Sequence, residues 1–132
     1  MSLVIRGGTI IDSEGEKKAD VAIGDDGLIT EVSSNLKGEE EIDASGCIVT
    51  SGFVDLHSHL REPGQEDAET IETGARGGAL GGYTALIAMP NTTPAMDCLA
   101  VIEQVRALGE KSVCEIIPTG TMTVGRNGEQ MS

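Results

Sequence analysis

The chain has 132 residues, and its 9 Lys and Arg against 22 Asp and Glu give a formal net charge of −13 at pH 7. A surface this acidic repels phosphate backbones and anionic headgroups, which excludes sequence-independent binding to nucleic acid or to a membrane surface. No apolar run approaches the roughly 20 residues of a membrane helix, and the first residues lack the features of a signal peptide, so we expect a soluble, cytoplasmic protein.

The first part of the chain alternates short Ile- and Val-rich runs with Gly, Asp and Ser. This pattern predicts a small antiparallel sheet, with a tight hairpin at Gly24–Gly27 and a solvated acidic loop at Lys37–Glu41. The expected strands are Leu3–Ile5, Thr9–Ile11, Ala19–Ile23, Leu28–Val32 and Ile48–Thr50. Residues 1–51 are therefore predicted to form a small β-rich domain.

From Gly52 onwards, apolar strands alternate with amphipathic helical patterns. The expected elements are a strand at Phe53–Leu60, a helix at Glu66–Leu80, a strand at Tyr83–Met89, a helix capped by Asp97 and closed by Gly109, and a strand at Val113–Ile117. This order is typical of a parallel sheet with crossover helices, so residues 52–132 are predicted to be α/β. Gly128–Ser132 looks like the start of a further helix.

Glycines and cysteines have structural interpretations. An interior helical glycine costs about 1 kcal/mol against alanine, so the glycines around Gly74–Gly82 predict a close approach of the first helix to the sheet. The chain contains no phosphate-loop motif. Three widely spaced cysteines, Cys47, Cys98 and Cys114, are predicted to be reduced core residues.

The chemistry is concentrated at the end of the first α/β strand. Four polar residues alternate there and so share one face of the strand: Asp55, His57, His59 and Arg61. On a buried strand these groups cost several kcal/mol unless they bind a metal, a ligand or one another. The carboxyl end of such a strand is where α/β enzymes build their sites. His57 and His59 are therefore predicted to ligate a zinc-like ion, with Asp55 in a supporting position.

Two histidines do not complete a zinc centre. A catalytic zinc needs three protein ligands and a water, and the chain has no third histidine. Glu62 could be the third ligand, although Pro63 indicates a turn that leads away from the pocket. The simpler interpretation assigns the missing ligands to later strands, so no catalytic residue is assigned within this chain.

A second loop, Met89–Pro94, follows the next strand and so reaches the same rim. The amide of Asn91 can contact a substrate there, although Asn in a Pro-flanked loop is also a common turn residue. The planar guanidinium of Arg61 suits a carboxylate, which it can bind through two hydrogen bonds. Both residues are candidates for substrate binding.

These motifs together resemble a known family. Gly52–Gly64, with its His-Ser-His-Leu-Arg-Glu-Pro-Gly run, closely resembles the signature of dihydroorotases in the amidohydrolase superfamily. Glu69–Gly74, Gly81–Thr84 and Met89–Thr92 are similar to that family's next segments in order and spacing. The resemblance covers essentially the whole chain.

The resemblance implies zinc-dependent, reversible cyclisation of N-carbamoyl-L-aspartate to dihydroorotate in de novo pyrimidine biosynthesis. It implies a (β/α)8 TIM barrel preceded by a small β-domain, with His57 and His59 as zinc ligands. It also implies that Arg61 and Asn91 hold the carboxylate of this small-molecule substrate. Zinc would polarise the ring amide carbonyl and supply the nucleophile.

A whole barrel takes about 250 residues, whereas residues 52–132 allow about three of its eight strands. We therefore expect an amino-terminal portion with an incomplete barrel, inactive by itself. Its unpaired strand edges and apolar surface predict association, for example as a homo-oligomer.

Two other functions fit the same pattern. A related cyclic amidohydrolase, such as an allantoinase or a hydantoinase, would share the metal face and bind a different ring. A non-catalytic dihydroorotase-like subunit could instead support aspartate transcarbamoylase, although the retention of both histidines argues against that role.

Overall fold

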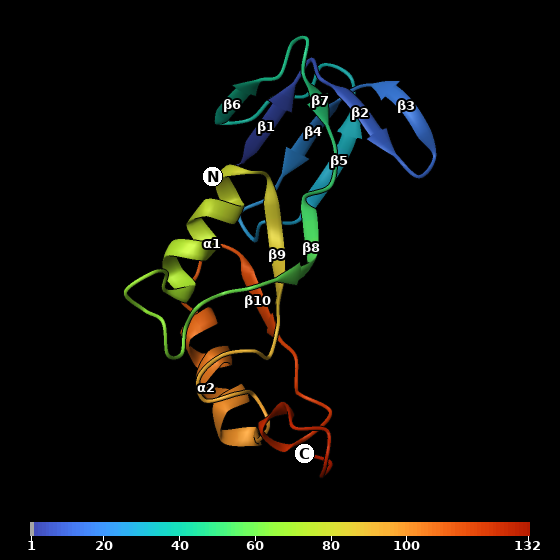
Figure 1. Cartoon of the computed structure of the whole chain (residues 1–132). Coiled ribbons are helices and arrows are strands. Elements are labelled where there is room, and N and C mark those ends of the chain that lie inside the picture. The colour runs from blue at the N-terminus through green and yellow to red at the C-terminus, as the bar shows by residue number, and fades with distance from the viewer. Residues whose placement is uncertain (1) are drawn as a thin grey trace. The chain divides into compact units, whose positions relative to one another are not determined.

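The computed structural model describes residues 2–132 (Figure 1). The chain forms two compact units that divide between Ser51 and Gly52, and each is described here by itself. None of the helices in the described part of the chain has the length and apolar character that crossing a membrane requires.

The first unit contains two small sheets with strand orders β5-β4-β1-β6 and β3-β2-β7. The strands are β1 Leu3–Arg6, β2 Thr9–Asp12, β3 Gly15–Lys18, β4 Asp20–Ile23, β5 Ile29–Ser33, β6 Glu40–Asp43 and β7 Ile48–Val49. Both sheets are mixed, because β1 pairs with β6, and β2 with β7, in parallel. The antiparallel pairing is confirmed for β1 with β4, β4 with β5, and β2 with β3. The prediction is wrong in giving one sheet and in omitting the two parallel pairs.

The acidic segment predicted as a loop is partly a strand. Its last residues belong to β6, and all four β6 residues are exposed. Backbone hydrogen bonds to β1 hold β6 in place, and no buried apolar face is needed. Its side chains therefore lack the alternation of apolar and polar residues that predicts a strand. The hairpin at Gly24–Gly27 is confirmed: the N–H of Gly24 donates to the carbonyl of Leu28 over 2.9 Å, and Gly27 has a φ of 78°.

A buried carboxylate joins three segments of the first unit. Asp20 lies in β4 with 8% of its surface exposed. Its Oδ1 accepts from the N–H of Gly7 over 2.8 Å, and its Oδ2 accepts from the N–H of Leu36 over 3.1 Å. The hydrogen bond from Gly7 is the largest of the causes that lower the pKa of Asp20. The ionised form of Asp20 is thus the one that the fold stabilises.

The second unit is α/β, as predicted. Its elements are β8 Phe53–Ser58, α1 Ile71–Leu80, β9 Tyr83–Ala88, α2 Leu99–Gly109, β10 Glu115–Pro118 and a short 3-10 helix, η1 Val124–Arg126. The three strands are parallel in the order β10-β9-β8. Both helices lie along one side of this sheet (Figure 1). The core between them consists of Leu60, Ile71, Ala75, Leu86, Ala88, Met96, Val101, Val105, Cys114 and Ile116.

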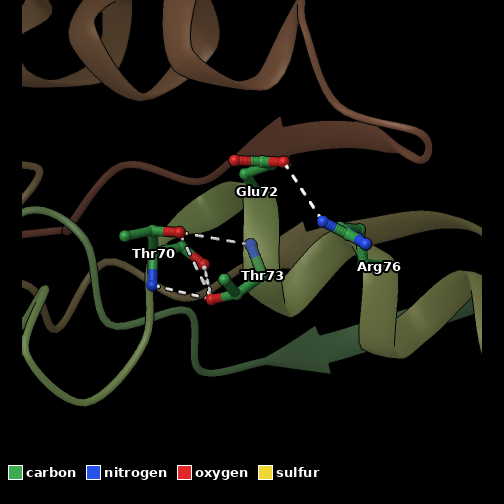
Figure 2. Close-up of polar contacts among 4 residues, drawn as sticks. All are labelled: Thr70, Glu72, Thr73 and Arg76. Carbon is green, nitrogen blue, oxygen red and sulfur yellow. Dashed lines mark hydrogen bonds and ion pairs between the residues drawn. The ribbon is translucent and has the colours of Figure 1, made fainter.

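Helix α1 begins five residues later than predicted, because its start is fixed by a reciprocal cap. Thr70 Oγ1 accepts from the N–H of Thr73 over 3.2 Å, and Thr73 Oγ1 accepts from the N–H of Thr70 over 3.0 Å (Figure 2). This capping box satisfies two backbone donors. One turn further on, Arg76 lies 3.7 Å from Glu72 across an exposed i,i+4 pair.

Two other end assignments also differ from prediction. The N-cap residue of α2 is Cys98, which makes no side-chain cap. Asp97 instead accepts from the N–H of Gly125 over 2.7 Å. Gly128–Ser132 is not helical, and Met131 forms an isolated bridge with Thr123.

The predicted close approach of α1 to the sheet is confirmed at Gly78, and at Gly74 the helix lies close to the segment after β8. A Cβ at Gly74 would lie 2.7 Å from Leu60 Cδ2, and one at Gly78 would lie 3.2 Å from Leu86 Cδ1. All three cysteines are free, but Cys47 and Cys98 are exposed, so the core assignment is right for Cys114 alone.

Two glycines of the second unit should respond in opposite ways to alanine. Gly64 has a φ of +105°, and a Cβ there would overlap the carbonyl oxygen of Thr93. Gly77 lies inside α1, where a Cβ meets nothing within 4 Å. We expect Gly64→Ala to lower the free energy of unfolding by about 1–3 kcal/mol and Gly77→Ala to raise it by about 0.5–1 kcal/mol. Urea denaturation measures both, and equal effects would contradict the prediction.

Replacing Asp20 by Asn should destabilise the first unit at neutral pH. Each carboxylate oxygen accepts one N–H, whereas an amide has a single acceptor and would set its NH2 against a backbone donor. Because the folded pKa is lowered, the contribution of Asp20 is complete above the unfolded pKa of about 3.9 and is lost as the pH falls through the folded value.

The urea midpoint of Asp20→Asn should therefore lie below that of the wild type at pH 7, and the gap should narrow below about pH 4. Glu39→Gln removes the same charge at an exposed residue whose side chain makes no hydrogen bond within residues 2–132. It is therefore the matched control. Equal midpoints for the two variants at pH 7 would refute the role of Asp20.

Candidate functional site

The two histidines converge although they do not share a strand. His57 lies in β8, which ends at Ser58, and His59 follows it. The pairing of β8 with β9 shifts register between Asp55 and Ser58, so strict alternation ends before His59. The two Nε2 atoms nevertheless lie 3.1 Å apart, with the rings at 64° to each other. Both residues are exposed.

This pair suits a metal ion. Imidazole nitrogens bind zinc at about 2.0–2.1 Å, so two nitrogens that share an ion lie no more than about 4 Å apart. The observed 3.1 Å is within that limit. Within residues 2–132 no cluster of three His, Cys, Asp or Glu side chains is placed to hold a metal. The pair could therefore provide two ligands of a metal centre, but not a third.

Asn91 joins this pair from the second motif. It lies in the loop after β9, and its Oδ1 is 2.9 Å from Nδ1 of His59. Two backbone hydrogen bonds hold the loop against the first motif. The N–H of Met89 donates to the carbonyl of Ser58 over 2.9 Å, and the N–H of Thr93 donates to the carbonyl of Pro63 over 3.0 Å. The two motifs thus form one site.

Asp55 supports the pair through the backbone. Its Oδ1 accepts from the N–H of His57 over 3.0 Å. This hydrogen bond is the main cause that lowers the pKa of Asp55. The ionised carboxylate of Asp55 thus fixes the backbone of His57. Within residues 2–132 it makes no hydrogen bond to the His57 ring.

Arg61 and Glu62 lie beyond the strand. Arg61 is outside β8, so the predicted common strand face does not extend to it; it is exposed and forms no ion pair within the described residues. Glu62 does not join the histidines. Its Oε2 accepts from the N–H of Ile71 over 2.8 Å, at the first residue of α1. The alternative of Glu62 as third metal ligand is therefore wrong, because its carboxylate caps the helix.

Two contacts of the site were not predicted. The sequence indicated the rim on which Asn91 lies, but not its contact with His59. For Glu62 a signal existed, since an acidic side chain a few residues before a helix suits the free N–H groups of the first turn.

Comparison with known proteins identifies the family to which the chain belongs. The sequence profile of a family described as "Dihydro-orotase-like" matches residues 46–132. The chain is 43% identical over 136 aligned residues to a dihydroorotase of Thermoanaerobacter sp., covering 100% of this chain and 31% of that protein. It is 45% identical over 133 residues to a dihydroorotase of Streptomyces coelicolor, covering 98% of this chain and 30% of that protein.

Solved structures show the same fold. An L-hydantoinase (dihydropyrimidinase) from Arthrobacter aurescens superposes with a TM-score of 0.80 at 24% identity, over 92% of this chain and 28% of that one. A D-hydantoinase from Bacillus sp. AR9 has a TM-score of 0.71 at 30% identity, over 88% of this chain and 26% of that one. A dihydroorotase has a TM-score of 0.69 at 19% identity, over 93% and 31%.

The chain thus spans about a third of the length of the curated relatives it matches. The matched profile covers the histidine pair, the loop of Asn91 and every element of the second unit. On this match and on its identity to curated dihydroorotases, the chain belongs to the dihydro-orotase-like family of amidohydrolases.

Proposed function

We propose that this chain is part of a zinc-dependent dihydroorotase, which interconverts N-carbamoyl-L-aspartate and dihydroorotate in pyrimidine biosynthesis. The observation that carries the proposal is the convergence of His57 Nε2 and His59 Nε2, 3.1 Å apart, in a chain 43% identical to a dihydroorotase. The relatives named dihydroorotase support the proposed reaction, and the histidine pair supports a metal in it.

In this proposal His57 and His59 hold the zinc through their Nε2 atoms. Zinc bound there would act as a Lewis acid on the ring amide carbonyl and would lower the pKa of a water molecule. Asp55 keeps the backbone of His57 in place through its hydrogen bond. The remaining ligands and the catalytic acid or base come from outside these residues, since the described part of the chain offers no third ligand.

Arg61 and Asn91 are proposed to hold the substrate's carboxylate. Arg61 is exposed on the loop after β8, with its guanidinium uncommitted to an ion pair in residues 2–132. Asn91 lies in the loop after β9 and contacts His59, two residues before Arg61 in the chain, which supports its part in the same site. A guanidinium and an amide NH2 both donate, and an anion binds such donors strongly.

A related cyclic amidohydrolase is the second candidate. The solved relatives include proteins named hydantoinase and dihydropyrimidinase, one of them 30% identical to this chain. An enzyme of that kind, or an allantoinase, would use the same two histidines as metal ligands and would bind a substrate with a different ring. The two candidates differ in the need for a cationic group at Arg61.

Association is part of the proposal. Large apolar side chains on β8 are exposed in this chain, among them Leu56 at 70% and Phe53 at 55%. Such surface favours a partner, which we propose to be further βα units, a second copy of the chain or, for a supporting subunit, an aspartate transcarbamoylase. The three free cysteines fit a cytoplasmic setting.

Removing the charge of Arg61 tests the substrate assignment. In a protein that carries the complete barrel, Arg61→Met should lower kcat/KM for carbamoyl-aspartate about 10²–10⁴-fold, because two charge-assisted hydrogen bonds are lost. Zinc content should not change. Arg76→Met is the matched control, since the one ion pair of Arg76 within residues 2–132 is with Glu72, on the exposed side of α1. A loss below about threefold for Arg61→Met would favour the hydantoinase alternative.

The isolated 132-residue chain should not turn over substrate. Two ligands leave the zinc without the third that a catalytic centre uses. Purified chain supplied with zinc should show no cyclisation of carbamoyl-aspartate above the rate of His57→Asn/His59→Asn. A rate that rises with bound zinc and disappears in the double variant would show that the site is complete without further residues.

A further inference from the structure

The contact between Asn91 and His59 has a chemical consequence for the metal site. A neutral imidazole carries one N–H, and its other nitrogen has the lone pair that can bind a metal. In His59 the Nδ1 atom lies 2.9 Å from Asn91 Oδ1, while Nε2 lies 3.1 Å from His57 Nε2. Because a side-chain carbonyl oxygen only accepts, this contact requires the proton on Nδ1.

We infer that Asn91 is a positioning residue for the metal centre. Its Oδ1 accepts the Nδ1–H of His59 and so keeps the lone pair of Nε2 free on the side that faces His57. The same contact fixes the rotation of the imidazole ring. The inference deepens the proposed function, on which it rests, because it assigns Asn91 a role toward the zinc in addition to the substrate.

The loop is built to hold this amide still. The N–H of Met89 is bonded to Ser58, the residue between the two histidines, and that of Thr93 is bonded to Pro63. Within the loop, the N–H of Met96 donates to the carbonyl of Pro90 over 3.2 Å. Thr92 is buried, and Asn91 is half-buried. These hydrogen bonds fix the loop backbone on both sides of Asn91.

The oxygen and the nitrogen of the Asn91 amide then have different roles. Oδ1 is committed to His59, and Nδ2 makes no hydrogen bond within residues 2–132. A free NH2 group beside the two histidines can donate a hydrogen bond to the substrate's anionic group. One side chain would thus couple the orientation of a ligand to the binding of the substrate, so that the two properties can be separated by substitution.

The tautomer of His59 tests the inference without metal or substrate. The chain contains only two histidines, so long-range ¹H–¹⁵N spectra of the metal-free chain give two ring patterns, which His57→Asn assigns. The spectra are recorded at a pH at which both rings are neutral. We expect His59 to carry its proton on Nδ1 in the wild type. A proton on Nε2 would overturn the inference at once.

Three variants separate the amide from the loop. Asn91→Leu removes the acceptor and should abolish the preference for Nδ1–H. Asn91→Asp keeps an acceptor oxygen and should retain it. Thr92→Val removes the neighbouring hydroxyl but not the contact, and should retain it as well. An unchanged tautomer in Asn91→Leu, or an equal change in Thr92→Val, would refute the role of the amide. If Asn91→Leu does not fold, Asn91→Ala takes its place.

Metal binding gives the second readout. Co²⁺ affinity, followed by the same signals, should fall about 10–100-fold in Asn91→Leu, as expected when the partner of a ligating histidine is lost. Asn91→Asp should bind Co²⁺ at least as tightly as the wild type, while the complete enzyme with this change should lose carbamoyl-aspartate binding by charge repulsion. Equal Co²⁺ affinity of the wild type, Asn91→Leu and Asn91→Asp would overturn the inference.

Failure of the proposed function would look different. If the tautomer and the Co²⁺ affinities behave as expected but a zinc-loaded complete enzyme does not cyclise carbamoyl-aspartate, then Asn91 positions His59 in a metal protein with another substrate. If the enzyme is active and the tautomer does not respond to Asn91, the proposed function stands and the positioning role is wrong.

Discussion

The site depends on the backbone pairing at the ends of β8 and β9, where the N–H of Met89 donates to the carbonyl of Ser58 over 2.9 Å. This hydrogen bond lies beyond the register shift of β8 against β9 and falls between the two histidines. Parallel strands end at the same edge of a sheet, so this contact brings the start of the second loop next to the first motif. The distance between Asn91 and His59 follows from it. A slip of one residue in this pairing would turn the side chains to the opposite face.

The residues after His59 have separate structural duties, which explains why a long motif is needed to position two ligands. Leu60 and Pro63 are buried. Glu62 bonds the first N–H of α1, and Gly64 takes a positive φ against Thr93. Each position tolerates few residue types. A Cβ at Gly64, the loss of the Glu62 carboxylate or a polar residue at Leu60 would each destabilise the fold. The motif thus connects the two histidines to α1 through Glu62 and to the loop after β9 through Pro63.

The sequence was a good guide where side-chain burial determines structure. The strands of the second unit were predicted from their apolar runs, and the close approach of α1 to the sheet was predicted from the glycines around Gly74–Gly82. It was a poor guide where the backbone alone decides: β6 is an exposed acidic strand, and α1 starts where Thr70 and Thr73 cap each other. The convergence of His57 with His59 was expected from alternation, yet it arises at an interrupted strand. The contact of Asn91 with His59 depends on ring rotation, which no spacing encodes.

Exposed strand surface and a two-ligand centre are connected in this molecule. β8 contains three large apolar residues, Phe53, Val54 and Leu56, and each of them is at least half exposed. The same strand carries the first histidine and ends beside the second. In a parallel barrel the neighbours that would cover such a strand are also those whose carboxyl ends face its own. Under the proposed function, further βα units that bury β8 would therefore bring their strand ends, and the ligands on them, to the histidine pair.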